Sequence, residues 1–385
     1  MDQKFRYTTA NRRQRNDHGE ITLSAVNALA LATGKPWDEV FHQLEDQAVF
    51  YGQMLHENIC AVGLLAAMGY ARVKKPRGCQ TLQDISQYLA GTWPHVTSAI
   101  LVTHIQGAPV SSRRFQLLLP EKNPDGGKRF VLHDTMDRGR FSCVSTLYLP
   151  AAEAGLQVSP PKCPSSIDVP RSLPQNHFGY RFFQPNPRNN FIGDCVIRAY
   201  AAVLDVDWGT ALRRLAQSCD LNLTWLNLVD VDQYLLSELK CTHHEALRTD
   251  GHLLKGVDFC AYMNAHCHHG ERIFVHAGPH HVAAVIPDPD ETRHPRYVIA
   301  DCWDSSCEFF RDYWVYTPPE PAKPAPCPGQ PLTEVQEGSC ILHPTYGKGE
   351  IVALNKASGS CRIRFLDGSE RSLSAAWILE KCTAA

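Results

Sequence analysis

The pattern of apolar and polar residues in the middle of the chain predicts helices first. From residue 195 to 204, alanines and other apolar residues cover most faces of a helix, as expected of a buried one. Asp207 can cap a second helix that starts at Trp208. Residues 230–239 and 256–264 have the spacing of two further helices.

Extended segments follow these helices. Residues 272–276, 281–286, 296–300 and 312–316 are short runs of β-branched, aromatic and other apolar residues, which predict strands. Helices followed by an antiparallel sheet are typical of the α+β class. We therefore expect an α+β fold for this part of the chain.

Two proline-rich stretches, at 158–174 and 317–331, divide the chain. Each proline removes a backbone donor, so neither stretch can continue a helix or a central strand. The second stretch has the composition of a semi-rigid polyproline spacer, and a chain of 385 residues is too long for one typical core. The expected domains are 1–150, 177–316 and 333–385, joined by linkers over 151–176 and 317–332.

The segments 1–150 and 177–316 look like copies of one another, and we call them the first copy and the second copy. Four stretches match in the same order, which is typical of an internal duplication, whereas chance similarity of amphipathic segments would not keep the order. The matches begin by aligning Phe5 with Tyr180, Thr22 with Gly193, Arg113 with His280, and Arg129 with Arg296.

Composition places few limits on function. The formal net charge is −2, so no overall electrostatic attraction to nucleic acid or to a membrane is expected. The N-terminal residues lack the apolar core of an export signal, and no apolar run has a transmembrane length. Without an export signal the 15 cysteines are expected to be reduced thiols of a cytoplasmic protein.

Cys195 stands where a Gly-Asp turn meets the first predicted helix, in the stretch N-N-F-I-G-D-C-V-I-R. The reactive form of cysteine is the thiolate, and the first turn of a helix lowers the thiol pKa because its free amide groups favour negative charge. Asp194 is expected to be the N-cap of this helix. The position therefore suits a reactive thiolate, and it suits a packed, inert thiol no better than it would suit alanine.

A thiolate nucleophile needs a proton partner and a group that orients this partner. His281 opens a predicted strand and can face a helix start across a cleft. Asp301 follows the next strand and is expected to orient the imidazole, with Asp304 in reserve. Asn189 and Asn190, shortly before the cysteine, could donate a side-chain amide to an oxyanion.

This order of residues resembles that of papain-like cysteine peptidases. It is most similar to the bacteriocin-processing type, in which a polar amide residue precedes an Asp-Cys pair; Asn189 takes the place of the usual glutamine. The resemblance covers 180–316 and, more weakly, 5–149. It implies tandem papain-like domains, the Cys-His-Asp set above as a catalytic triad, and neither a cofactor nor a metal.

The first copy has lost the residues that such chemistry needs. Ser24 and Arg114 stand where the second copy has its cysteine and histidine, and only Asp134 keeps the counterpart of Asp301. An arginine cannot accept a proton near neutral pH, so we expect the first copy to be inactive. It would then bind a partner protein or substrate, or cover the second copy as a regulatory lid.

The segment 335–382 is expected to be a compact β barrel, since it contains five short runs and a D-G turn at 367–368. The runs are S-C-I-L-H, G-E-I-V-A-L, C-R-I-R-F-L, R-S-L-S and W-I-L-E-K. The stretches H-P-T-Y-G-K-G-E-I-V and I-R-F-L-D-G-S resemble the Tudor or SH3-like module of certain bacterial DNA helicases, which binds partner proteins or nucleic acid. Gly347 and Gly349 would allow the tight bend between the first two strands.

Several functions stay open at this point. The expected reaction is thiolate attack on an acyl carbon, by a peptidase, an isopeptidase, or a deamidase or transglutaminase. The alternative is a non-enzymatic interaction protein, such as a phage structural or host-interfering factor, and a third possibility is nucleic-acid binding by the C-terminal module. The Cys- and His-rich stretch 260–269 lacks the short fixed spacings of zinc sites. The basic stretches 12–15 and 111–114 lack the interleaved aromatic residues of a nucleic-acid surface.

Overall fold

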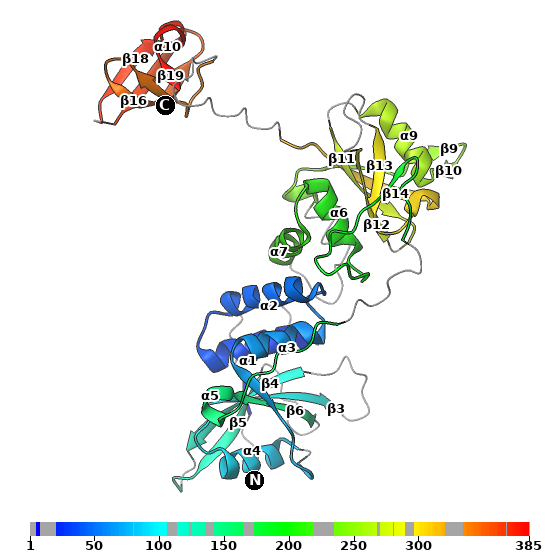
Figure 1. The fold of residues 1–385 in the computed structure, drawn as a ribbon, viewed down its shortest axis with the longest axis vertical. Coiled ribbons are helices and arrows are strands. Elements are labelled where there is room, and N and C mark those ends of the chain that lie inside the picture. The colour runs from blue at the N-terminus through cyan, green and yellow to red at the C-terminus, as the bar shows by residue number, and fades with distance from the viewer. Residues whose placement is uncertain are drawn as a thin grey trace. The chain divides into compact units, whose positions relative to one another are not determined.

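The chain forms two compact units, Met1–Pro318 and Pro319–Ala385, and the first unit contains both copies (Figure 1). Helices and sheets occur together in each unit, so the α+β class is confirmed. The structure is a computed structural model that describes residues 5–7, 21–79, 81–105, 114–122, 125–134, 142–164, 173–218, 235–267, 270–279, 281–288, 296–319, 334–366 and 368–384.

The first copy is a sheet with helices on both faces. Its helices are α1 (Ile21–Thr33), α2 (Trp37–Tyr51), α3 (Asn58–Ala67) and α4 (Leu82–Thr92). The short helix α5 (Ala151–Ala154) directly follows the last strand of the copy. Its strands are β1 (Phe5–Tyr7), β2 (Tyr70–Val73), β3 (Ala99–Ile105), β4 (Arg114–Lys122), β5 (Lys128–Asp134) and β6 (Ser142–Pro150). The strand order is β1-β5-β4-β3-β6-β2, and β1 and β5 are the parallel pair in it.

The second copy repeats this plan. Its helices are α6 (Cys195–Leu204), α7 (Trp208–Ser218), α9 (Gly256–His266) and the 3₁₀ turn η2 (Ser305–Cys307). Its strands are β7 (Tyr180–Phe182), β8 (Thr242–His244), β11 (Arg272–Ala277), β12 (His281–Pro287), β13 (Tyr297–Asp301) and β14 (Phe310–Tyr316), with a small hairpin of β9 (Arg248–Thr249) and β10 (His252–Leu253). The order is β7-β13-β12-β11-β14-β8, and β13 and β7 are again the parallel pair.

The two sheets agree in register as well as in strand order. Leu117 pairs with His133 in the first copy, and the aligned residues Ala284 and Ala300 pair in the second. A register shift interrupts the pairing of β3 with β6, and one occurs at the equivalent place between β11 and β14. Because such details are set locally along each strand, their agreement supports an internal duplication.

In both copies the sheet lies between two layers of helices. Alternate residues of a strand point to opposite faces, so Ala284 of β12 packs in a cluster with α6, whereas Val285 packs in a cluster with α9. In the first copy α1, α2 and α3 cover one face of the sheet and α4 covers the other. The start of α6 is thereby held against the sheet that carries β12 and β13.

Most of the predicted elements of the second copy are confirmed. Helix α6 has the predicted bounds, and α7 begins at Trp208. Asp207 caps α7, since its Oδ1 accepts a hydrogen bond of 2.9 Å from the backbone N–H of Thr210. The four predicted strands coincide with β11, β12, β13 and β14, and the last predicted helix is α9. Of the helix predicted over 230–239, residues 230–234 lie outside the described residues, and residues 235–237 are helical.

The helical layers of the two copies meet and share one apolar core. At this junction the carbonyl groups at the end of α2 accept hydrogen bonds from side chains of the loop before α6. Asn186 Nδ2 donates to Gly52 O at 3.1 Å, and Arg188 Nε donates to Phe50 O at 2.7 Å. The guanidinium of Arg188 also lies 4.9 Å from the centre of the Phe50 ring. The end of a helix in the first copy is therefore capped by the second copy.

The C-terminal unit differs from its prediction in two respects. Its strands are β15 (Cys340–His343), β16 (Gly347–Asn355), β17 (Ser360–Phe365), β18 (Glu370–Ser374) and β19 (Thr383–Ala384), in the order β18-β17-β16-β15-β19. Among the described residues no pairing closes β18 onto β19, so the sheet is seen without the closure expected of a barrel. The run W-I-L-E-K is not a strand but part of the helix α10 (Ala375–Lys381), because the Ser374 hydroxyl accepts a hydrogen bond from the backbone N–H of Trp377 and caps a helix there.

The two glycines of the predicted bend have separate roles. Gly347 has a φ of 72°, which suits the turn before β16. Gly349 lies within β16, and a Cβ there would come within 2.8 Å of Ile363 and Phe365. Gly349 therefore allows close packing of two strands rather than a bend.

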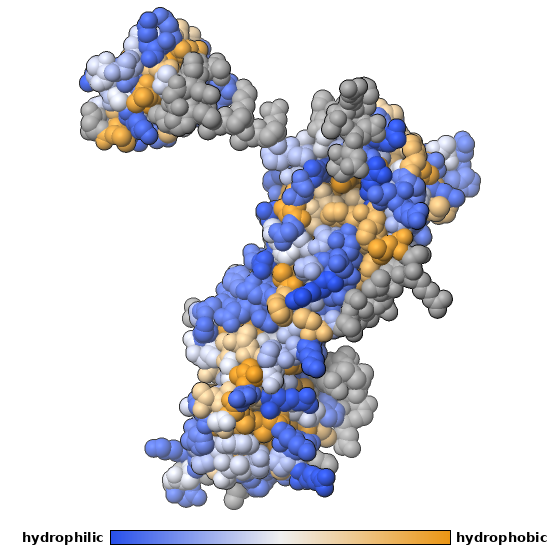
Figure 2. Space-filling view, viewed as in Figure 1, coloured by the Kyte–Doolittle hydropathy of each residue, from blue (hydrophilic) through white to orange (hydrophobic). Residues whose placement is uncertain are grey.

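Figure 2 shows a surface on which hydrophilic residues predominate, with apolar residues exposed in small groups on this face. Within the described part of the chain, every helix is too short or too polar to cross a bilayer.

Replacing Gly52 by alanine tests the junction, with Gly34 as a matched control. Both glycines are left-handed, with φ of 58° and 70°, so alanine strains either position by about 1–2 kcal/mol. A Cβ on Gly52 would also lie 2.5 Å from Asn186 Oδ1, whereas nothing lies within 4 Å of one on Gly34. We expect Gly52→Ala to lower the free energy of unfolding by at least about 1 kcal/mol more than Gly34→Ala, measured by urea denaturation. Equal losses would contradict the junction.

Candidate active site

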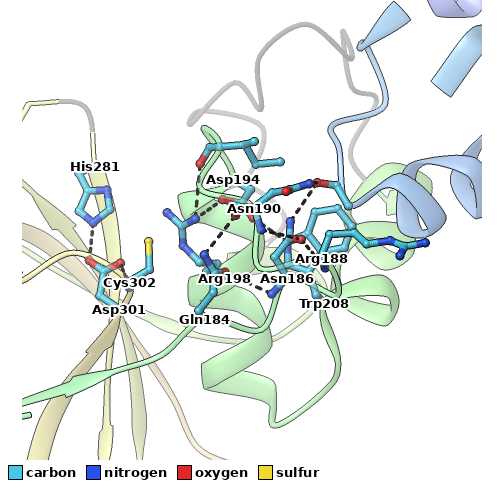
Figure 3. Close-up of polar contacts among 12 residues, drawn as sticks. Gln184, Asn186, Arg188, Asn190, Asp194, Arg198, Trp208, His281, Asp301 and Cys302 are labelled. Carbon is cyan, nitrogen blue, oxygen red and sulfur yellow. Dashed lines mark hydrogen bonds and ion pairs between the residues drawn. The ribbon is translucent and has the colours of Figure 1, made fainter. Parts of the chain in front are cut away.

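The first residue of α6 is Cys195, but its neighbour Asp194 does not cap the helix as predicted. The Asp194 carboxylate makes no hydrogen bond to the first-turn amides. It is fully buried, ion-pairs with Arg198, and accepts a hydrogen bond of 2.8 Å from the indole N–H of Trp208 (Figure 3). Burial explains the difference, because a carboxylate out of water needs a charged partner more than it needs a cap.

The structure brings Cys195 and His281 together. Cys195 is half-buried, and its sulfur interacts with the imidazole of His281 and with the backbone N–H of Val282. His281 is the first residue of β12, so a helix start and a strand start meet at the reactive pair. This is the arrangement that the sequence predicts for a nucleophile and its base.

Asp301 binds the other side of the same ring. His281 Nε2 and Asp301 Oδ2 are 2.5 Å apart, so Nδ1 is the nitrogen left to face the sulfur. The carboxylate of Asp301 is 2% exposed and also accepts hydrogen bonds from the Ser305 hydroxyl and from the Cys302 backbone N–H, at 2.5 Å and 2.7 Å. These two donors fix the carboxylate, and the carboxylate fixes the ring (Figure 3).

The electrostatics of the pair favour charge separation. Burial by itself raises the pKa of the Cys195 thiol, but hydrogen bonding and charge from His281, with smaller contributions from Val282 N–H and Arg198, bring this pKa below its ordinary value. Burial by itself lowers the pKa of His281, but hydrogen bonds and charge from Asp301 and Cys195 raise it to about 9. Both shifts favour a thiolate beside an imidazolium over the neutral pair.

Asp304, the reserve aspartate, lies outside this line of residues. Its carboxylate is bound to the ring of His177, with His177 Nε2 and Asp304 Oδ2 2.9 Å apart. It also caps the η2 turn by accepting a hydrogen bond from Ser306 N. Of the two aspartates, Asp301 orients the imidazole of His281 and Asp304 binds His177.

The two asparagines predicted to bind an oxyanion are differently placed. The amide nitrogen of the buried Asn190 donates to Tyr51 O and Gly52 O, at 3.1 Å and 3.0 Å. Both of these bonds go to carbonyl groups of the first copy. Asn189 is exposed and has a φ of 53°, and its backbone N–H donates to Asn186 O. The structure does not bring either side chain to Cys195.

Other residues of the site were not predicted. Arg198 and Trp208 hold Asp194, and the four-residue spacing of Asp194 and Arg198 along a helix was a usable sign of that pair. Gln184 Nε2 donates to Asn190 O, and the Asn186 side chain binds the first copy. No sequence signal marks these two, because their roles depend on partners that are distant in the chain or on loop geometry.

The first copy keeps the framework of the site without its chemistry. Ser24 Oγ accepts a hydrogen bond of 2.9 Å from the Phe115 backbone N–H, just as the Cys195 sulfur does from Val282. Arg114, which aligns with His281, is 2% exposed. The Asp134 backbone ends β5, while its side chain lies outside the described residues. An arginine in place of the imidazole removes the base.

Metal ligation has no support among the described residues, where no cluster of His, Cys, Asp and Glu could hold an ion. In the Cys- and His-rich stretch, Cys260 is buried with its sulfur 3.8 Å from Gly179 O, and the His266 ring binds Tyr262 O. His268 and His269 lie outside the described residues, as does the basic stretch 12–15.

Comparisons of the chain with known protein families, with curated proteins and with solved structures find no match.

Alkylation by iodoacetamide at pH 6 tests the charge separation. We expect Cys195 to be labelled while Cys302, whose pKa burial raises to about 12, stays unlabelled. His281→Gln removes the stabilising imidazolium, so labelling of Cys195 at this pH should slow by about tenfold and recover only as the pH rises. Mass spectrometry of the labelled peptides measures both effects. Equal rates at pH 6 in the wild type and in His281→Gln would contradict the pair.

Proposed function

We propose that the chain is a cysteine-dependent acyl hydrolase, most closely a papain-like peptidase or isopeptidase, with its active site in the second copy. The observation that carries this proposal is the line of interacting side chains from Cys195 through His281 to Asp301, in which His281 Nε2 and Asp301 Oδ2 are 2.5 Å apart. A thiol whose pKa is lowered by an imidazole, which is itself oriented by a buried carboxylate, has the arrangement needed for nucleophilic catalysis.

The residues have defined roles in this reaction. The Cys195 thiolate attacks the acyl carbon and forms a carbon–sulfur bond, while the carbonyl π electrons move to the oxygen. The His281 imidazolium then gives its Nδ1 proton to the leaving amine, and the carbon–nitrogen bond breaks. Water adds next, with His281 as the base, and the thiolate leaves as the carboxylic acid forms. Asp301 holds the ring throughout and stabilises its charged form.

The start of α6 supplies the donors for the oxyanion. The first turn of a helix has backbone N–H groups without partners inside the helix. The Asp194 side chain does not bind them, because it is turned inward to Arg198 and Trp208. The Cys195 N–H is therefore the main candidate donor, and an amide of Asn190 is not required.

The first copy has a supporting role in this proposal. It offers no base opposite Ser24, but the end of α2 binds Asn186, Arg188 and Asn190 in the loop that leads to the nucleophile. It would still offer surfaces for a partner or a substrate. Deamidase or transglutaminase activity would use the same acyl-enzyme with a different donor or acceptor.

We also propose that the C-terminal unit is a Tudor or SH3-like module that binds a partner. Its support is an aromatic cluster in which the His343 ring lies 4.5 Å from Tyr346 and 4.9 Å from Trp377. The Arg371 guanidinium lies 4.1 Å above the Tyr346 ring, which is 42% exposed. Exposed aromatic and arginine side chains are enriched at binding surfaces.

Digestion of a mixed peptide library by the purified full chain tests the hydrolase. We expect Cys195→Ala to abolish cleavage and His281→Gln to lower kcat/KM by about 10²–10⁴-fold, since general acid–base catalysis is lost. Ser24→Ala, at the aligned position of the first copy, should leave the rate within about twofold. Mass spectrometry of the products provides the measurement.

The pH profile is a second readout of the same experiment. Activity should decline as the pH rises through about 9, where His281 loses its proton, and should persist below the ordinary thiol pKa because that of Cys195 is lowered. Cleavage that is unchanged in Cys195→Ala would overturn the proposal, and no cleavage of any peptide would favour an interaction protein.

A further inference from the structure

A cavity of about 400 Å³ opens beside the reactive histidine. One wall is the turn between β11 and β12, from Ala277 to Pro279, together with His281. The other wall is the segment after β13, where Trp303, Ser305 and Glu308 line the space. Of these three residues, Ser305 is the one whose side chain also binds the Asp301 carboxylate.

The place of the cavity determines which part of a substrate would enter it. In the proposed reaction His281 gives its proton to the leaving amine, so the leaving group has to lie against this ring. A cavity lined by the same ring therefore takes the side chain next to the leaving amine. This step rests on the proposed function.

The charges of the cavity are negative. Asp304 is also part of the wall, but its carboxylate is bound to His177 at 2.9 Å. The Glu308 carboxylate lies over the turn, since its Oε2 would be 3.3 Å from a Cβ on Gly278. Among the described residues no cation forms an ion pair with Glu308. His281 is the basic group of the wall, and its positive charge is paired with the Asp301 carboxylate and the Cys195 sulfur.

The apolar part of the cavity is an aromatic surface. The Trp303 side chain is 59% exposed, an unusual exposure for a large apolar group and one that leaves its ring available to a ligand. Tryptophan is the aromatic side chain that attracts cations most strongly through its π face. A planar guanidinium can stack on this face and bind a carboxylate at the same time.

We propose that this cavity selects a basic residue, with arginine preferred to lysine, on the leaving-group side of the bond that is broken. The aliphatic part of the side chain packs on Trp303, and the charge pairs with Glu308. An acidic residue would be repelled by Glu308 and Asp304, and a neutral one would leave the Glu308 carboxylate without a partner.

Sequencing the new N-termini that the wild type creates in a peptide library tests this preference. We expect enrichment of arginine and lysine at the first position after the cleaved bond. Glu308→Gln should lower kcat/KM by about tenfold for peptides with arginine there and by less than about twofold for matched peptides with norleucine. Glu308→Arg should reverse the preference toward glutamate. Cys195-dependent cleavage without a basic preference would overturn this inference and leave the hydrolase standing.

Protection of the thiol gives a test that needs no turnover. Argininamide bound in the cavity should slow alkylation of Cys195 by iodoacetamide at lower concentrations than norleucinamide, which has the same α-amine without the second cation. Glu308→Gln should raise the half-protecting concentration of argininamide by about tenfold. This change would abolish the difference between the two amides. Circular dichroism would confirm that the variant is folded. Equal protection by the two amides in the wild type would contradict the site, even if no peptide substrate is found.

Discussion

The pairing of β12 with β13 is the constraint on which the candidate active site depends. Ala284 pairs with Ala300, and this register, continued toward the strand ends, puts Asp301 diagonally across from His281 on the same side of the sheet. A shift by one residue would turn one of these side chains to the opposite face. The apolar residues that alternate along both strands and pack in separate clusters oppose such a shift. The core thus fixes the geometry of the chemistry.

The nucleophile is positioned from the other direction, by polar contacts that cross the boundary between the copies. The loop before α6 is tied to the end of α2 through Asn186 and Asn190, and it leads to the buried pair of Asp194 and Arg198. A buried ion pair contributes little net stability but is costly to break, because one charge is then left alone. The start of α6 therefore has few alternative arrangements. The first copy thus contributes contacts to the candidate site of the second copy.

The sequence predicted what depends on short-range pattern. The bounds of α6, the cap of α7 and the order of Cys195, His281 and Asp301 at element ends follow from periodicity and local residue types. It did not predict contacts set by distant partners. Asp194 bound Trp208 and Arg198 rather than the first-turn amides of α6, and Asn190 bound the first copy. The run 377–381 was misassigned because apolar residues in a short segment fit a strand and a capped helix equally well.

The hydrogen bond from a strand amide to the first turn of a helix is present in both copies, to sulfur at Cys195 and to oxygen at Ser24. Its donors, Val282 and Phe115, occupy aligned positions. The bond needs only an acceptor atom at the end of a short side chain. Either a hydroxyl or a thiol can therefore anchor the start of the helix. Selection that acts on folding alone thus does not distinguish the two side chains.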